Sequence, residues 1–209
     1  MKSTRSRSKI LTIVLAALTV SGLLLPGGFV RTAGAQQRDI PERLVERASQ
    51  ITGDDFPVYV RTVRGAHVFA RREPRGEVLD AIDDGLTELF SISRRHGYRS
   101  RLDYSQYVVF IARADRTEDS RGAYSPDIAI PAGQYAGSDY DQGGYIYAAG
   151  MVMAYSPCAF IIAEHDRDMP RISNVVRYEG EHLVLYHNDR PLYTRTADHS
   201  RGGGHPILR

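Results

Sequence analysis

The chain has 209 residues, of which 27 are basic and 25 acidic, and it contains a single cysteine. One cysteine excludes an internal disulfide, so the fold depends on its apolar core. The arginines are scattered singly or in pairs, without a basic stripe or interleaved aromatic residues. This pattern gives no indication of a nucleic-acid partner.

Residues 1–35 have the pattern of a signal peptide. Basic residues open the segment, an uncharged apolar run of 16 residues follows from Ile10 to Leu25, and the small residues Ala33-Gly34-Ala35 form a cleavage site. The run is shorter than the roughly 20 residues of a membrane-spanning helix. We therefore expect cleavage, export to the periplasm or the exterior, and no membrane span in the mature chain. A retained membrane anchor is the alternative, and the absence of a nearby cysteine excludes a lipoprotein.

Cleavage would change the charge of the protein. The segment holds five basic residues and no acidic ones, so residues 36–209 keep 22 basic and 25 acidic residues, a net charge of −3 instead of +2. Both lysines lie in the segment, so every remaining basic residue is an arginine. The remaining length suits one domain with a sizeable core.

The first half of the mature chain predicts a helix, a hairpin, a long helix and a buried strand. A helix is expected from about residue 39 to Gly53, and alternating residues predict a hairpin over 56–63 and 68–70. A 3.6-residue apolar period predicts a long helix from 74 or 77 to 96. Residues 104–114 predict a buried strand.

The second half predicts a long loop, two strands and a helix that carries histidine. Residues 115–143 are irregular, and a loop of this length often has a function or forms a lid. Within it, residues 139–143 resemble a calcium loop that lacks its further acidic ligands and distal glutamate. Strands are expected over 144–155 and 158–163, the latter starting with Cys158 as a buried thiol. A helix over 173–188 follows, with Pro170 as the alternative start, then a short helix from Pro191 to Ala197 and a glycine-rich tail over 200–209.

These elements predict an α+β fold. We expect a single mixed domain over 36–209, with an antiparallel-rich sheet, a long helix in its N-terminal half and a C-terminal helix bearing histidine.

Four of the seven histidines lie in the last 28 residues, namely His182, His187, His199 and His205. Imidazole is the commonest metal ligand in proteins. His187 lies five positions after His182, about 140° around a helix, so both cannot face one metal unless the helix ends between them. We interpret His187 as a C-terminal histidine favoured by the helix dipole.

The segment Tyr178-Glu179-Gly180-Glu181-His182 resembles the HExxH helix of the zincin metallopeptidases, with tyrosine in place of the first histidine. The resemblance covers about one helix. It implies that His182 binds a metal, that Glu179 is the catalytic base, and that a further ligand comes from beyond the helix.

In a second interpretation, Glu179 and His182 at positions i and i+3 both bind the metal. His199 and His205 would complete the shell, because Gly202-Gly203-Gly204 lets the tail fold tightly. The role of Glu179 as base or ligand stays open.

The neighbouring residues have a structural and a functional interpretation. Tyr178 and Tyr186 could donate to an oxyanion, although tyrosines on a helix more often pack in a core or groove. Glu181 follows Arg177 by four positions, which predicts an exposed ion pair. In the purely structural alternative, the histidines and tyrosines satisfy one another by hydrogen bonds.

The sequence therefore predicts an exported metal-dependent hydrolase, of peptidase type, that uses zinc or another divalent transition metal on peptides or cell-envelope material. The alternative is a non-catalytic secreted binding or structural domain with a degenerate zincin-like shape. In that case the tyrosines of residues 115–143 would provide the contact surface.

Overall fold

The computed structural model describes residues 40–114, 127–131, 133, 143–165 and 167–208. In chain order the elements are α1 (Glu42–Thr52), β1 (Val58–Arg61), β2 (His67–Ala70), α2 (Gly76–Arg95), the 3-10 helix η2 (Tyr104–Gln106), β3 (Tyr107–Ala112), β4 (Ile128–Pro131), β5 (Tyr145–Ala148), β6 (Gly150–Tyr155), β7 (Cys158–Ala163), α3 (Met169–Asn188), α4 (Arg190–Thr196) and the 3-10 helix η4 (His199–Arg201).

The main sheet has five strands in the order β1-β2-β3-β7-β6. Its three central strands run parallel, whereas β1 and β6 pair antiparallel at the two edges. Strands β4 and β5 form a separate antiparallel pair. Every residue of β2, β3 and β7 is buried, which agrees with their continuous apolar sequence, since parallel strands are covered on both faces.

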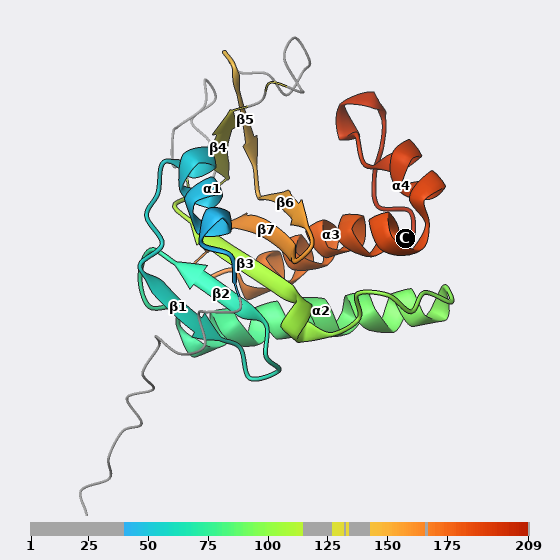
Figure 1. Ribbon diagram of the computed structural model, residues 1–209, viewed down its shortest axis with the longest axis horizontal. Coiled ribbons are helices and arrows are strands. Elements are labelled where there is room, and N and C mark those ends of the chain that lie inside the picture. Colours follow the sequence, from blue (N-terminus) through green and yellow to red (C-terminus); the bar gives the residue numbers. More distant parts are fainter. Residues whose placement is uncertain (1–39, 115–126, 132, 134–142, 166, 209) are drawn as a thin grey trace, which may run out of the picture. The chain divides into compact units, whose positions relative to one another are not determined.

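Helices cover both faces of the main sheet (Figure 1). Val109 and Ile111 of β3 pack in a core cluster with apolar residues of α2 and α3. Val108 and Phe110, the alternate residues of the same strand, pack with α1 and β4 on the other face. The predicted α+β fold, with its long helix and its histidine-bearing helix, is confirmed. Three of the five strand pairings are antiparallel, but the centre of the main sheet is parallel.

Two glycines allow α2 and α3 to pack closely side by side (Figure 1). A Cβ atom at Gly85 would lie 2.5 Å from the carbonyl oxygen of Ser173 in α3. A Cβ atom at Gly180 would lie 2.5 Å from Leu89 Cδ2 in α2. Both distances are below van der Waals contact, so the glycine in the Tyr178–His182 segment is explained by helix packing.

Two predictions about the second half of the chain are wrong in detail. Strand β4 lies inside the segment 115–143 that was expected to be irregular, and it pairs with β5. The single strand expected over 144–155 consists of β5 and β6, which end and begin on either side of Ala149 and belong to different sheets. Cys158 is buried at the start of β7, as predicted.

Other predictions fall on residues that the structure does not describe. The signal peptide (1–35), most of the 139–143 segment, and Tyr124, Tyr135 and Tyr140 lie outside the described residues. Among the residues that are described, none of the helices has the length and apolar character needed to cross a membrane.

Candidate metal centre

Aspartate side chains cap the start of α3 and the start of α4, the helix that follows it directly. The Asp168 carboxylate accepts a hydrogen bond from the Arg171 backbone N–H at 3.0 Å, with Pro170 in the first turn. Asp189 ends α3 and begins α4, accepting a hydrogen bond from the Leu192 N–H at 3.0 Å. These are N-cap interactions, and Asp189 lets the chain turn back directly after α3.

The tail then folds tightly, as its glycines predict. Gly202 has a φ of 80°, in the left-handed region that favours glycine. A Cβ atom at Gly203 would lie 2.3 Å from the carbonyl oxygen of Thr196. The close turn directs the last residues back onto α3, where Ile207 packs against Leu185 and Ile92.

This turn brings three histidines together. His182 of α3 and His199 and His205 of the tail each offer one ligand nitrogen, and the three nitrogens lie within 4.8 Å of one another. The ring centroids are 4.8 to 5.1 Å apart. Tetrahedral zinc with bonds of about 2.0–2.1 Å holds its nitrogens roughly 3.3 Å apart, so shifts of about one ångström would close the group around an ion. The described residues contain no other such group.

The chemical state of the histidines suits a metal. His182 is 7% exposed, and burial lowers its pKa to about 3, assisted by His205 and His199. Burial also lowers the pKa of His199. Both rings are therefore neutral at pH 7, the form that binds metals. Two ring nitrogens, His182 Nδ1 and His199 Nε2, are buried without a hydrogen-bond partner among the described residues. Leaving a buried polar atom without a partner costs free energy.

Glu181 orients the third histidine. It is 0% exposed, and its two oxygens accept hydrogen bonds from His205 Nδ1 at 2.7 Å and from the Ile207 backbone N–H at 2.8 Å. A carboxylate that accepts from Nδ1–H leaves the lone pair of Nε2 available for a metal, which is the usual second-shell arrangement of a zinc-bound histidine. The predicted exposed pair of Glu181 with Arg177 is wrong. Arg177 pairs with Glu88 of α2 instead.

Tyr178 contacts the group of three histidines through its ring. Its ring stacks on the His205 imidazole, with centroids 4.5 Å apart and planes at 19°. Tyr178, at the position of the first histidine of an HExxH helix, therefore packs against a histidine of the tail.

Glu179 and His182 face a pocket of about 580 Å³ together with His199. Glu179 is half-buried, and this burial raises the pKa of its carboxyl group to about 8. A hydrogen bond from the Val152 backbone has the opposite effect on this pKa but is the weaker of the two. The carboxyl group is therefore mostly neutral at pH 7 in the metal-free protein. Strands β4, β5 and β6 line the pocket opposite α3 and α4. Gly150 lets β6 approach, since a Cβ atom there would lie 2.7 Å from Glu179 Cγ.

The phenols at this pocket are not those expected from the sequence. Tyr147 of β5, Tyr155 of β6 and Tyr193 of α4 line it, and the hydroxyls of Tyr155 and Tyr193 share a hydrogen bond. Burial, the bond to Tyr193 and nearby tyrosines raise the pKa of Tyr155, so its hydroxyl stays protonated at neutral pH. Tyr186 stacks on Tyr155, with centroids 3.8 Å apart, and lies under Arg190. Neither Tyr178 nor Tyr186 is among the described lining residues of the pocket.

His187 lies apart from the three grouped histidines, in keeping with its angle on the helix. Its Nε2 donates to the Tyr155 carbonyl oxygen at 2.7 Å.

Fold and site together define an α+β protein whose three histidines could hold a metal ion. Comparison with known protein families, with curated proteins and with solved structures finds no match.

Proposed function

We propose that this protein is a metal-dependent hydrolase in which His182, His199 and His205 hold zinc or a similar divalent transition metal. The proposal depends on one observation: three histidines converge beside a pocket that also contains Glu179. Three protein ligands with an open fourth position are typical of catalytic zinc, whereas structural zinc is closed by four protein ligands.

The metal would supply Lewis acidity toward a substrate carbonyl and toward the attacking water. Glu179 is the general base in this proposal. It lies outside the group of three ligand residues but one helical turn before His182, on the same pocket. A base whose pKa is close to neutral can both accept the proton of water and return it to the leaving group.

Tyr155 is the proposed oxyanion donor, because it keeps its proton at neutral pH and lines the pocket. Its hydrogen bond with Tyr193 holds the hydroxyl in place. Tyr178 then has a positioning role, through its stacking on His205. Tyr186 supports the ring of Tyr155 from behind.

Peptides are the proposed substrates. Strand β6 forms an edge of the main sheet and lines the pocket with Gly150, Met151 and Val152. An extended peptide binds such an edge through its backbone, while side-chain pockets give specificity. The apolar residues Ile130 and Ile146 in the same lining would favour apolar side chains near the scissile bond.

The experiment is a hydrolysis assay on purified residues 36–209 with a mixed-sequence fluorogenic peptide library, after loading with zinc. The Glu179→Gln variant should keep its zinc and lose at least about a hundredfold in kcat/KM, the scale of a general base. His182→Ala should lose both zinc and activity. If Glu179→Gln retains full activity, Glu179 is not the base. If the zinc-loaded wild type cleaves no peptide of the library, the proposal of a peptide hydrolase is wrong.

A further inference from the structure

The carboxyl ends of the three parallel strands meet at one edge of the main sheet, where arginines collect. Arg71 and Arg72 follow β2, Arg113 follows β3, and Glu164 follows β7. After β2 the chain leads to α2 on one face, while after β3 it leads to β4 on the other. Open sheets with parallel strands bind ligands at carboxyl ends where the chain departs to opposite faces.

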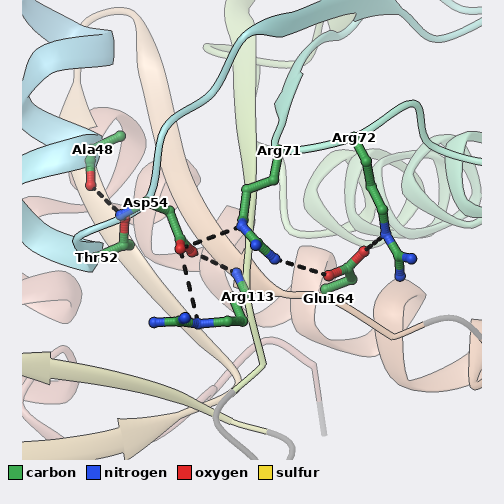
Figure 2. Close-up of polar contacts among 7 residues, drawn as sticks. All are labelled: Ala48, Thr52, Asp54, Arg71, Arg72, Arg113 and Glu164. Carbon is green, nitrogen blue, oxygen red and sulfur yellow. Dashed lines mark hydrogen bonds and ion pairs between the residues drawn. The ribbon is translucent and has the colours of Figure 1, made fainter.

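Two carboxylates hold these arginines in position (Figure 2). Asp54, which is 6% exposed, has its Oδ1 3.3 Å from Arg71 Nε and 4.0 Å from Arg113 Nε, and its Oδ2 accepts the Arg113 backbone N–H at 2.7 Å. Glu164 pairs with both Arg71 and Arg72. Three guanidinium groups and two carboxylates leave one net positive charge at this edge.

Two hollows open beside this network and share Arg71, Arg72 and Glu164 in their linings. The one on the α2 side has a volume of about 280 Å³, the space of roughly nine water molecules at ~30 Å³ each. Its lining adds the cations Arg75 and Arg167, one further carboxylate, Glu73, and the apolar Val78 and Ile111. The other hollow, of about 560 Å³, adds Arg113 and Asp54.

The start of α2 lines the smaller hollow. This helix has 20 residues, its N-cap is Arg75, and no side chain forms a cap hydrogen bond. The partial positive charge of a helix N-terminus adds to that of the guanidinium groups, and such termini bind phosphate.

We propose that this edge of the sheet binds the phosphate group of a small phosphate monoester. Arg71 and Arg72 would hold the phosphate oxygens with their planar forks, a geometry that matches phosphate. The apolar wall of Val78 and Ile111 would contact the organic part of the ester. Glu164 occupies the same guanidinium groups in the absence of ligand, so it competes with the phosphate.

The site is separate from the histidine cluster. His182 lies 13 residues after Met169 at the start of α3, about 20 Å along the helix, and is not in the lining of either hollow. The proposal therefore does not depend on metal binding.

Isothermal titration of residues 36–209 with inorganic phosphate and with glycerol 3-phosphate tests the proposal. We expect the monoester to bind with a Kd below about 1 mM and more tightly than inorganic phosphate, which lacks the organic part. Arg71→Gln should weaken binding about tenfold or more. Glu164→Gln should strengthen it about fivefold, because the competing carboxylate is removed. Arg43→Gln, an exposed arginine of α1, is the matched control and should have no effect.

Opposite effects of the two network variants distinguish a binding site from a purely structural network. If Glu164→Gln and Arg71→Gln both weaken binding, or if the wild type does not bind the monoester with a Kd below about 1 mM, the proposal is wrong. Thermal melting of each variant shows whether it folds. Binding in the His182→Ala variant should equal that of the wild type, so a failure of the hydrolase proposal leaves this result unaffected.

Discussion

Replacement of Glu181 by glutamine tests how the tail histidine is positioned. The two carboxylate oxygens each accept one N–H, from His205 and from Ile207. A glutamine has one acceptor oxygen and one NH2 donor. If the oxygen keeps the backbone N–H of Ile207, the NH2 group faces His205 Nδ1. The imidazole must then adopt the other tautomer, with its proton on Nε2, the nitrogen proposed to bind the metal.

The expected loss follows from this change. Removal of an outer-shell partner of a metal-binding histidine costs about 10–100-fold in metal affinity, or about 1.4–2.8 kcal/mol. Glu181 is fully buried, so water cannot replace the lost acceptor, and we expect a value toward the upper end. The metal-free protein should also lose about 1–3 kcal/mol of unfolding free energy.

Competition with a chromophoric zinc chelator measures the affinity, and ¹⁵N NMR of the histidine rings reports the tautomer. Glu88→Gln is the control, since Glu88 is an exposed carboxylate that pairs with Arg177. We expect that variant to match the wild type. Zinc affinity within twofold of wild type in Glu181→Gln, with the His205 tautomer unchanged, would refute the reasoning.

Three further predictions concern the pocket. Gly150→Ala places a Cβ atom 2.7 Å from Glu179 Cγ, so it should displace Glu179. We expect hydrolysis to fall at least about tenfold while the zinc stoichiometry stays the same. A normal rate would show that the position of Glu179 is unimportant. Zinc binding at pH 7 should release about one proton per ion, because a nearby cation lowers the Glu179 pKa from about 8. Calorimetry in two buffers of different ionisation enthalpy measures the number of protons released. An equal release in Glu179→Gln would show that the proton does not come from Glu179. In the metal-free protein, the His182 pKa of about 3 lies below its unfolded value of 6.5, so its contribution to stability is present above pH 6.5 and is lost as the pH falls toward 3. Between pH 7 and pH 5, the unfolding free energy of the wild type should fall by about 2 kcal/mol relative to that of a His182→Asn variant, as measured by chemical denaturation. The comparison cancels the contribution of Glu179, whose raised pKa favours the folded state at lower pH. An equal pH dependence in the two proteins would refute the prediction.

Local patterns in the sequence are sufficient for much of the fold. The apolar period of α2 and the continuous apolar runs of β3 and β7 identify those elements, because such patterns require burial on one or both faces. The position of β4 could not be predicted in this way. Its buried residues Ile128 and Ile130 alternate with Ala129 and Pro131, but four residues that end at a proline are too short a run to predict a strand, and they form one by pairing with β5.

The three grouped histidines could be selected from sequence, but the residues that support them could not. His182, His199 and His205 were predicted together from their clustering and the glycines between them. The i, i+4 spacing of Arg177 and Glu181 predicts an exposed ion pair, which would place Glu181 at the surface. The residues Gly180 to Leu185 are all buried, so this part of α3 has no solvent face. The run Leu183-Val184-Leu185 beside Glu181 is the signal that could have indicated this.

Tyr155 and Tyr193 show a second limit of local patterns. They come from β6 and α4, 38 positions apart, and only the turn at Asp189 brings their hydroxyls together. No spacing rule within one element relates them, whereas Tyr178 and Tyr186 share a helix with His182 at a spacing of four residues.

The most direct test of the metal site is elemental analysis of purified residues 36–209, after incubation with zinc and removal of free metal, in wild type and two histidine variants. The account predicts about one zinc per chain in wild type, none in His182→Ala, and about one in His187→Ala, because His187 binds the Tyr155 carbonyl outside the group of three. No bound metal in wild type, or undiminished metal in His182→Ala, would contradict it.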